Sequence, residues 1–266
     1  MINVKKYNIL NIISKGCFGN VYKCKYNNKE FALKEEIIKS TLINEANIYK
    51  ELKNVNNIAK MYDFFLFNDK YYLILDLYYC NLNDFKLNFY NNINYISDLK
   101  TILKTILITI QNLHLNGYVH RDLKPKNICL DKNNNPYIID FGMAKKIIYK
   151  NNHIEERKIY NIIGTPNYIS NNVINLIEPT RRDDIESIIY IYLYMLLNDE
   201  LYKKYDDLEL NNKKYIETII DYFIKLNLYN NFNLNIDNIS KIIKYIKLMK
   251  YTQTPNYIYI IDKIFT

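Results

Sequence analysis

Residues 7–34 alternate apolar and polar positions in three short runs, YNILNIIS, NVYKCKY and KEFALK. Alternation with a period of two is typical of β-strands that bury one face. The pair Asn27-Asn28 separates the last two runs and is typical of a hairpin turn. We therefore predict three antiparallel strands in this segment.

A helix and two further strands are expected next. Residues 41–53 carry apolar positions at helical spacing, and Ser40 or Thr41 is a candidate for the helix cap. Apolar runs at 61–67 and 71–77 predict strands. The N-terminal part is therefore expected to be a small lobe of five strands with one helix.

From about Asn81 onward, the apolar positions follow the period of helices. Four helices are predicted in this part, at 98–117, 183–197, 212–228 and 237–250. The second of them is almost wholly apolar, so it should be buried. The fold class is thus α+β, with a small antiparallel β lobe, a short hinge and a larger, mainly helical lobe. Ligands commonly bind between two such lobes.

Composition narrows the class of protein. Hydrophobic residues make up 49% of the chain and charged residues 24%, which is ordinary for a soluble protein. No apolar run is long enough for a membrane helix and the N-terminus lacks a signal peptide, so we expect a cytoplasmic protein with no membrane partner. The four cysteines are scattered and read as reduced thiols.

The net charge of +8 suits a partner that carries phosphates or acidic side chains. The lysines are dispersed among helices and loops, so we do not expect a nucleic-acid partner. We expect the protein to be a monomer.

The strongest chemical signal is the sequence HRDLKPKN at 120–127, followed by Asp140-Phe141-Gly142. Phosphoryl transfer needs positioned charge more than covalent help. Asp122 can accept the proton of an incoming hydroxyl group, and Asn127 and Asp140 can hold Mg²⁺ ions that bridge phosphates, with Mn²⁺ as an alternative. Ordinary loop charges would not reproduce eight specified residues, so the signature is very specific.

The segment between these two motifs, ICLDKNNNPYIID, reads as a hairpin with its turn at 133–135. Such a hairpin would bring Asn127 and Asp140 together.

A second motif lies in the N-terminal lobe. The segment from Ile13 to Val21 contains Gly16 and Gly19, and glycines there let the main chain approach phosphate oxygens. This signal is weak alone, because Ser14 stands where a first glycine is usual. Its weight comes from the following strand, whose Lys34 can hold the phosphates of ATP.

A buried lysine needs a carboxylate to hold its charge. Glu45 and Glu51 both lie on the first predicted helix. A resemblance to protein kinases, which these motifs carry, favours Glu45, because its distance to the next strand fits the spacing usual in that family better. Thr165, in an Ile-Gly-Thr-Pro segment, is expected to bond Asp122 and Lys124, with a simple turn threonine as the alternative.

With these motifs placed, the sequence resembles the eukaryotic protein kinase superfamily over its whole length. The segments EANIYK at 45–50 and RRDDIES at 181–187 resemble the casein kinase 1 and vaccinia-related group of serine/threonine kinases. The resemblance implies one kinase domain over 1–266, with the small lobe at 1–77 and the helical lobe at 78–266.

The same resemblance implies roles for individual residues. Asp184 would brace the catalytic loop, Leu75 would be the gatekeeper and the Leu77 main chain would face adenine. Beside Gly16, Gly19, Lys34 and Glu45, the ATP-binding set comprises Ile13, Val21, Ala32, Leu75, Leu77 and Cys129.

The resemblance also implies the acceptor and the regulation. Lys124, two places after the base, indicates protein substrates with serine or threonine rather than tyrosine. Between Gly142 and Thr165 the only hydroxyl side chains are Tyr149 and Tyr160, so we expect an enzyme that is active as synthesised.

One departure concerns the substrate. The Leu-Pro-Trp segment that helps casein kinase 1 bind a phosphorylated substrate is missing here. Arg181 could still bind such an anion, so acidic or pre-phosphorylated substrates are a hypothesis. The lysines that could assist are Lys203, Lys204, Lys213 and Lys214.

Two alternatives stay open. A pseudokinase or scaffold on the same fold would be expected to lack the base, the lysine or a metal ligand, yet these are present. A small-molecule phosphotransferase of the aminoglycoside type would lack the Gly-Thr-Pro and Arg-Arg-Asp-Asp segments. If a virus encodes the chain, its location would be the host-cell cytoplasm.

Overall fold

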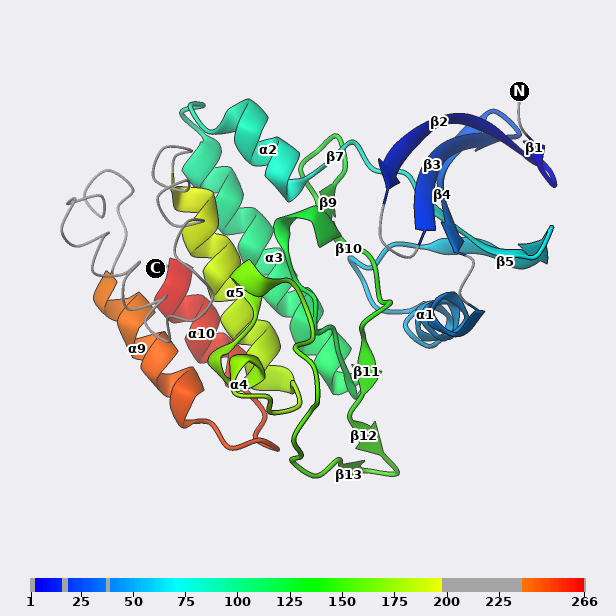
Figure 1. The fold of residues 1–266 in the computed structure, drawn as a ribbon. Coiled ribbons are helices and arrows are strands. Elements are labelled where there is room, and N and C mark those ends of the chain that lie inside the picture. The colour runs from blue at the N-terminus through cyan, green and yellow to red at the C-terminus, as the bar shows by residue number, and fades with distance from the viewer. Residues whose placement is uncertain (1–2, 16–18, 37–38, 198–235, 266) are drawn as a thin grey trace.

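The computed structural model describes residues 3–15, 19–36, 39–197 and 236–265 (Figure 1). Its N-terminal part is a six-stranded antiparallel sheet with one helix, α1 (Lys39–Glu51), beside it. In spatial order the strands are β1 (Asn3–Val4), β2 (Tyr7–Lys15), β3 (Gly19–Tyr26), β4 (Lys29–Glu36), β6 (Lys70–Asp76) and β5 (Met61–Phe67).

The sheet confirms the five expected strands, three predicted from alternation and two from apolar runs, and adds the two-residue β1, which is too short to show a period. Asn27 and Asn28 form the turn between β3 and β4 with φ of 46° and 62°, the left-handed values that favour asparagine. The helix α1 begins before the expected residue 41, so Thr41 lies within its first turn. Its hydroxyl donates to Glu36 at 2.6 Å.

The pleat of β4 sorts its side chains onto two faces. Phe31 and Leu33 join a hydrophobic cluster with Tyr7 and Tyr72 on one face. Since successive side chains point to opposite faces, Ala32, Lys34 and Glu36 lie on the other face, together with the partners that the sheet register sets opposite them. Leu75 of β6 is opposite Ala32, and Val21 of β3 is opposite Lys34.

The larger part is mainly helical. Its helices are α2 (Leu82–Phe89), α3 (Tyr95–Leu115), α4 (Asn171–Ile174), α5 (Arg181–Leu196), α9 (Ile236–Leu248) and α10 (Tyr257–Phe265), with short 3-10 turns at Pro125–Asn127 and Pro166–Tyr168. Its strands are β7 (Cys80–Asn81), β8 (Tyr118–Val119), β9 (Ile128–Leu130), β10 (Pro136–Ile138), β11 (Lys145–Lys146), β12 (Ile148–Tyr149) and β13 (Asn152–His153).

Three of the four predicted helices are confirmed as α3, α5 and α9, with ends shifted by one to three residues. The helix expected at 212–228 lies outside the described residues. The predictions missed α2, α10 and the four-residue α4. In α2, Asn81 and Asp84 form a reciprocal capping box, a signal that the sequence carries as Asn-x-x-Asp.

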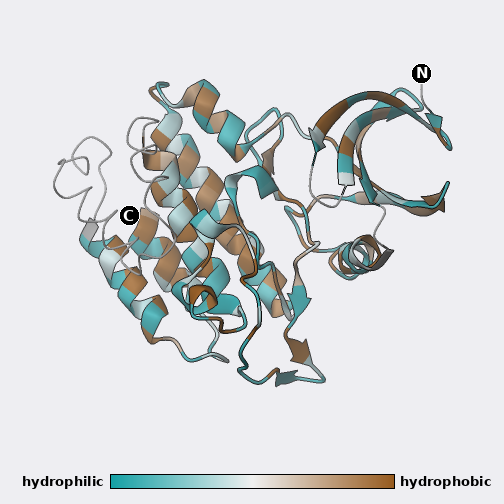
Figure 2. Ribbon diagram, in the orientation of Figure 1, coloured by the Kyte–Doolittle hydropathy of each residue, from teal (hydrophilic) through white to brown (hydrophobic). Residues whose placement is uncertain are grey.

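The core of this part is built on α3 and α5, which lie side by side (Figure 1). Brown, hydrophobic residues recur along both helices in Figure 2. All residues of α5 except Tyr194 are buried, as its apolar sequence predicted. This buried helix gives the neighbouring loops a rigid support.

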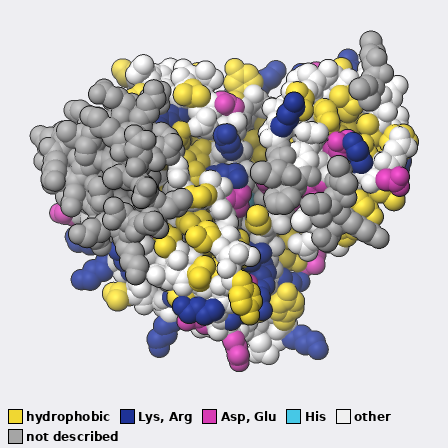
Figure 3. Space-filling view, in the orientation of Figure 1, with side chains coloured by type: hydrophobic (Ala, Val, Ile, Leu, Met, Phe, Trp, Pro, Cys, Tyr) yellow, Lys and Arg dark blue, Asp and Glu magenta, His cyan; other side chains and the backbone are white. Residues whose placement is uncertain are grey.

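None of the helices in the described ranges is both long and apolar enough to cross a membrane. On the face shown in Figure 3, basic side chains are spread over both parts of the molecule.

The central position of α3 leads to a stability prediction. Leu103 is fully buried, whereas Leu115 on the same helix is 71% exposed. Leu103→Ala should lower the free energy of unfolding by about 2–5 kcal/mol because it leaves a cavity, and Leu115→Ala by no more than ~0.5 kcal/mol. Urea unfolding followed by circular dichroism measures both. Equal losses would contradict the assignment of α3 to the core.

Candidate functional site

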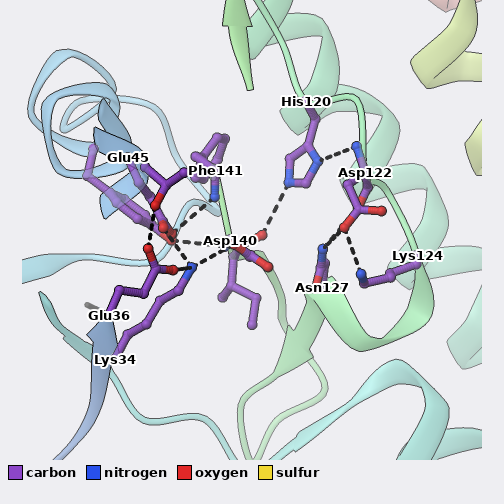
Figure 4. A network of polar contacts seen from close by, with 12 residues as sticks. Lys34, Glu36, Glu45, His120, Asp122, Lys124, Asn127, Asp140 and Phe141 are labelled. Atoms are coloured by element: carbon purple, nitrogen blue, oxygen red, sulfur yellow. Dashed lines mark hydrogen bonds and ion pairs between the residues drawn. The ribbon is translucent and has the colours of Figure 1, made fainter. Parts of the chain in front are cut away.

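The sequence-predicted residues gather in two polar clusters near the junction of the sheet and the helical part (Figure 4). The first surrounds the ammonium group of Lys34 on β4. Its Nζ lies 2.7 Å from Glu45 Oε2 on α1 and 3.0 Å from Asp140 Oδ1, and 3.3 Å from Glu36 Oε1. Glu45, not Glu51, is thus the partner of Lys34. Glu51 pairs with Lys146 instead, at 2.7 Å.

The carboxyl group of Glu45 also fixes the segment after Asp140. Its Oε1 accepts a hydrogen bond from the main-chain nitrogen of Phe141 at 3.2 Å. Tyr49, one helical turn further along α1, accepts from the main-chain nitrogen of Asp140 at 3.1 Å and packs edge-on against the Phe141 ring. Helix α1 therefore holds Asp140 and Phe141 through both polar and aromatic contacts.

The charged groups in this cluster shift one another's pKa values. Burial would lower the pKa of Lys34, but the carboxylates of Glu45 and Asp140 raise it. Burial likewise would raise the pKa of Asp140, but Lys34 lowers it. Burial raises the pKa of Glu45 to about 7, against the opposite effect of Lys34. Lys34 therefore stays charged and Asp140 ionised at neutral pH.

The second cluster surrounds the carboxylate of Asp122. Thr165 donates its hydroxyl to Asp122 Oδ1 at 2.7 Å, and Lys124 Nζ lies 2.7 Å from Asp122 Oδ2. Lys124 also donates to the Thr165 hydroxyl at 3.0 Å, which closes a triangle. Asn127 Nδ2 donates to the main-chain oxygen of Asp122 at 2.9 Å and to Oδ2 at 3.2 Å.

A buried carboxylate below the loop sets its shape. Asp184, near the start of α5, accepts from the main-chain nitrogens of His120 at 2.7 Å and Arg121 at 2.9 Å. His114 Nε2 lies 2.9 Å from the same carboxylate, and His114 Nδ1 lies 2.5 Å from the Tyr257 hydroxyl. Burial lowers the pKa of His114. Burial would raise the pKa of Asp184, but the hydrogen bonds and charges of His114 and His120 together lower it. A neutral His114 therefore donates to an ionised Asp184.

The ring of His120 joins the loop to Asp140. Its Nε2 lies 3.2 Å from the main-chain oxygen of Ile139, and Asp122 donates its main-chain nitrogen to Nδ1 at 3.3 Å. Both contacts are satisfied when the proton sits on Nε2. The expected hairpin is present as β9 and β10, and the main-chain nitrogen of Ile139 donates to the main-chain oxygen of Asn127 at 3.0 Å.

Glycines are required at two points of the site. A Cβ at Gly19 would lie 1.7 Å from the main-chain oxygen of Glu35, so β3 approaches β4 more closely there than a side chain permits. Gly164 has φ of 101°, and a Cβ there would lie 2.7 Å from the main-chain oxygen of Arg121. This close approach brings Thr165 beside Asp122.

The remaining ATP-binding predictions lie on the sheet and the following segments. Gly16 lies outside the described residues. Ile13 is 48% exposed and Leu75 is 7% exposed, whereas four others are partly buried. Those four are Val21 on β3, Ala32 on β4, Leu77 after β6 and Cys129 on β9.

Arg181 does not lie on an open surface. It is 7% exposed, and its Nη2 donates to the main-chain oxygen of Thr252 at 2.6 Å. A buried guanidinium that already donates to the protein leaves little access for a substrate anion, so its geometry does not support the predicted anion site. The lysines expected to assist lie outside the described residues.

Two acidic residues beside the site were not predicted. Glu36 is the third carboxylate around Lys34, and its strand position, two residues from Lys34, is the signal that could have revealed it. Glu178 contacts Arg121, which precedes Asp122 in sequence. No local motif marks Glu178.

Comparison with known proteins agrees with this geometry. The chain matches the protein kinase domain over residues 7–263. The chain belongs to the protein kinase domain family. This kinase domain is 30% identical over 281 residues to a probable casein kinase I homolog of Encephalitozoon cuniculi, in an alignment that covers 98% of this chain and 86% of that protein.

The Lys34 cluster predicts a pH-dependent stability. In Lys34→Met, three carboxylates would face one another without a cation, so their folded-state pKa values would rise above the unfolded ones. The variant should then lose more stability than the wild type as the pH rises, whereas the raised pKa of Lys34 keeps the charge of that lysine constant over this range. We expect a deficit of about 3 kcal/mol at pH 8 that narrows toward pH 5.

Urea unfolding of both proteins between pH 5 and pH 8 measures this difference. Lys70→Met is the control, since Lys70 pairs with Glu35 at 3.2 Å but its side chain is 40% exposed. A deficit of Lys34→Met that does not change with pH would contradict the role of Lys34 in neutralising these carboxylates.

Proposed function

We propose that the chain is an active serine/threonine protein kinase that transfers the γ-phosphate of ATP to hydroxyl groups of proteins. The observation that carries the proposal is the pairing of Lys34 with Glu45 at 2.7 Å while the same ammonium lies 3.0 Å from Asp140. Phosphoryl transfer by kinases needs this lysine pair and this aspartate in place together. We take residues 1–77 as the small lobe and 78–266 as the large lobe of one domain.

Binding of ATP is supported by the residues around Lys34. The Lys34 ammonium can exchange a carboxylate contact for the α- and β-phosphates, while Glu45 keeps it oriented. Gly16 and Gly19 would let the main chain approach the phosphates. The adenine ring would lie among Ile13, Val21, Ala32, Leu75, Leu77 and Cys129.

Asn127 and Asp140 fit the requirements of a magnesium site. The carboxyl of Asp140 is ionised, and the amide nitrogen of Asn127 donates to Asp122, which leaves the amide oxygen as the group for a cation. Within the described ranges no three His, Cys, Asp or Glu residues form a metal site on their own. A Mg²⁺ or Mn²⁺ ion would thus take its other ligands from phosphates and water, and when bound it would neutralise charge on the transferred group.

Asp122 is the proposed catalytic base. Its carboxylate is held by Thr165, Lys124 and Asn127, so it is oriented before a substrate arrives. It would accept the hydroxyl proton of the substrate as the phosphoryl group is transferred. Lys124, which contacts both Asp122 and Thr165, would then stabilise the transferred phosphoryl group.

The preference for serine and threonine rests on Lys124 and on the similarity to a casein kinase I homolog. The absence of serine and threonine between Gly142 and Thr165 supports an enzyme that is active as synthesised. We propose a monomer located in the cytoplasm.

Replacement of the base tests the activity. Wild type incubated with labelled ATP, magnesium and casein should incorporate phosphate, and Asp122→Asn should lower the rate by roughly 10³-fold or more, because the isosteric amide cannot accept the proton. Affinity for ADP, measured by calorimetry, should change little. Equal incorporation by the two proteins would refute the proposal, and an inactive wild type that still binds ADP would favour a pseudokinase.

The acceptor is tested with matched peptides. A peptide with serine should be phosphorylated at least ~10-fold faster than the same peptide with tyrosine, because Thr165 and Lys124 frame a short hydroxyl side chain beside Asp122. A second pair, with phosphoserine or alanine three residues before the target serine, tests the preference for pre-phosphorylated substrates. Equal rates for that pair would discard the preference without affecting the assignment as a kinase.

A further inference from the structure

A second buried carboxylate lies behind the catalytic loop, in a cluster that the proposed chemistry does not use. Glu178 precedes α5, and its side chain is 1% exposed. Three cations surround it. Its Oε1 contacts Lys145 Nζ, lies 3.3 Å from Arg157 Nη2 and 3.7 Å from Arg121 Nη1, and its Oε2 accepts from Arg157 Nε.

A buried carboxylate is costly unless its charge is paired and its oxygens are bonded. Here the cations reverse the effect of burial, and the pKa of Glu178 lies below its usual value. Glu178 is therefore a permanent anion at neutral pH.

The three partners come from segments that must be aligned for catalysis. Arg121 precedes Asp122, and its Nε also donates to the main-chain oxygen of Met143 at 2.6 Å. Lys145 lies on β11, which pairs with β8 just before the catalytic loop. Arg157 lies in the segment after β13, and its main-chain oxygen accepts from Glu178 N at 3.0 Å. One carboxylate thus joins the catalytic loop to both ends of the segment 143–158.

Many kinases join these parts with a phosphate added to a serine or threonine of the activation segment, which then pairs with arginine. This chain has no serine or threonine between Gly142 and Thr165. We propose that Glu178 is the built-in anion that takes the place of that phosphate: it holds Arg121 and the segment 143–158, and through Arg121 it positions Asp122. The inference rests on the proposed function in that Asp122 is taken as the base.

Glu178→Gln keeps the shape of the side chain and removes its charge. It should lower kcat for peptide phosphorylation by roughly 10- to 100-fold, the scale of loss when a reacting group is misplaced by about an ångström, with KM for ATP within about twofold. Glu186→Gln is the matched control, because Glu186 is equally buried but bonds Asn171 and Tyr190. Glu186→Gln should leave kcat within about twofold of the wild-type value.

If Glu178→Gln does not fold, the less disruptive substitutions Arg157→Met and Lys158→Met test the same role of Glu178. The Arg157 side chain is 65% exposed, so Arg157→Met should fold and still weaken the cluster, lowering kcat by about threefold or more. Its neighbour Lys158 donates to Asn175 instead, and Lys158→Met should leave kcat unchanged. Normal kcat in both Glu178→Gln and Arg157→Met, or equal losses in the controls, would overturn the proposal.

Hydrogen exchange separates this inference from the proposed function. In Glu178→Gln or Arg157→Met, amides of 143–158 should exchange at least ~10-fold faster, whereas those of α5 keep their protection. Faster exchange in these variants, together with a wild type that proves inactive, would retain the holding role of Glu178 and refute the kinase activity. Unchanged exchange at 143–158 would overturn the role of Glu178 whatever the activity.

Discussion

The arrangement of the site depends on one carboxylate, that of Asp184. It accepts two main-chain hydrogen bonds from His120 and Arg121 and a third from the His114 ring. Because α5 is buried in the core, a carboxylate in its first turn connects the core to the main chain of the loop, which is also anchored by the buried side chains of His120 and Leu123. The loop needs this support, since Arg121 has φ of 69°, a conformation that costs energy for a residue with a side chain. Asp184 therefore fixes the main chain just before Asp122, and Thr165 and Lys124 orient its carboxylate directly.

At many turns of this chain, asparagine adopts the left-handed backbone angles for which glycine is the usual residue. The chain contains only five glycines. Within the described part of the chain, left-handed backbone angles occur at six asparagines, namely Asn27, Asn28, Asn57, Asn68, Asn134 and Asn151. Asparagine tolerates these angles because its short side chain can bond the local main chain. Glycine is retained where a Cβ would collide with main-chain atoms, as at Gly19 and Gly164.

The parts that could be predicted are those encoded locally. Alternation predicted β2, β3 and β4, apolar runs predicted β5 and β6, and helical periodicity predicted α3 and α5. Contiguous motifs singled out Asp122, Asn127 and Asp140. Each of these signals lies within a short stretch of sequence. Contacts between distant segments could not be read in this way. Arg181 was expected to face a substrate, but its direction is set by Thr252, 71 residues away along the chain. The partners of Glu178 likewise lie 21 to 57 residues before it. The position of α10 also depends on contacts with distant segments, such as the one between Tyr257 and His114, 143 residues apart along the chain.

The cluster around Glu178 has a consequence for how the proposed kinase activity could be regulated. A carboxylate of the polypeptide cannot be removed by a phosphatase, so a phosphatase could not release an activation segment held by Glu178. If the enzyme is active as proposed, its output would follow its rates of synthesis and degradation and the supply of its substrates. A cell would then lower the activity by degrading the protein.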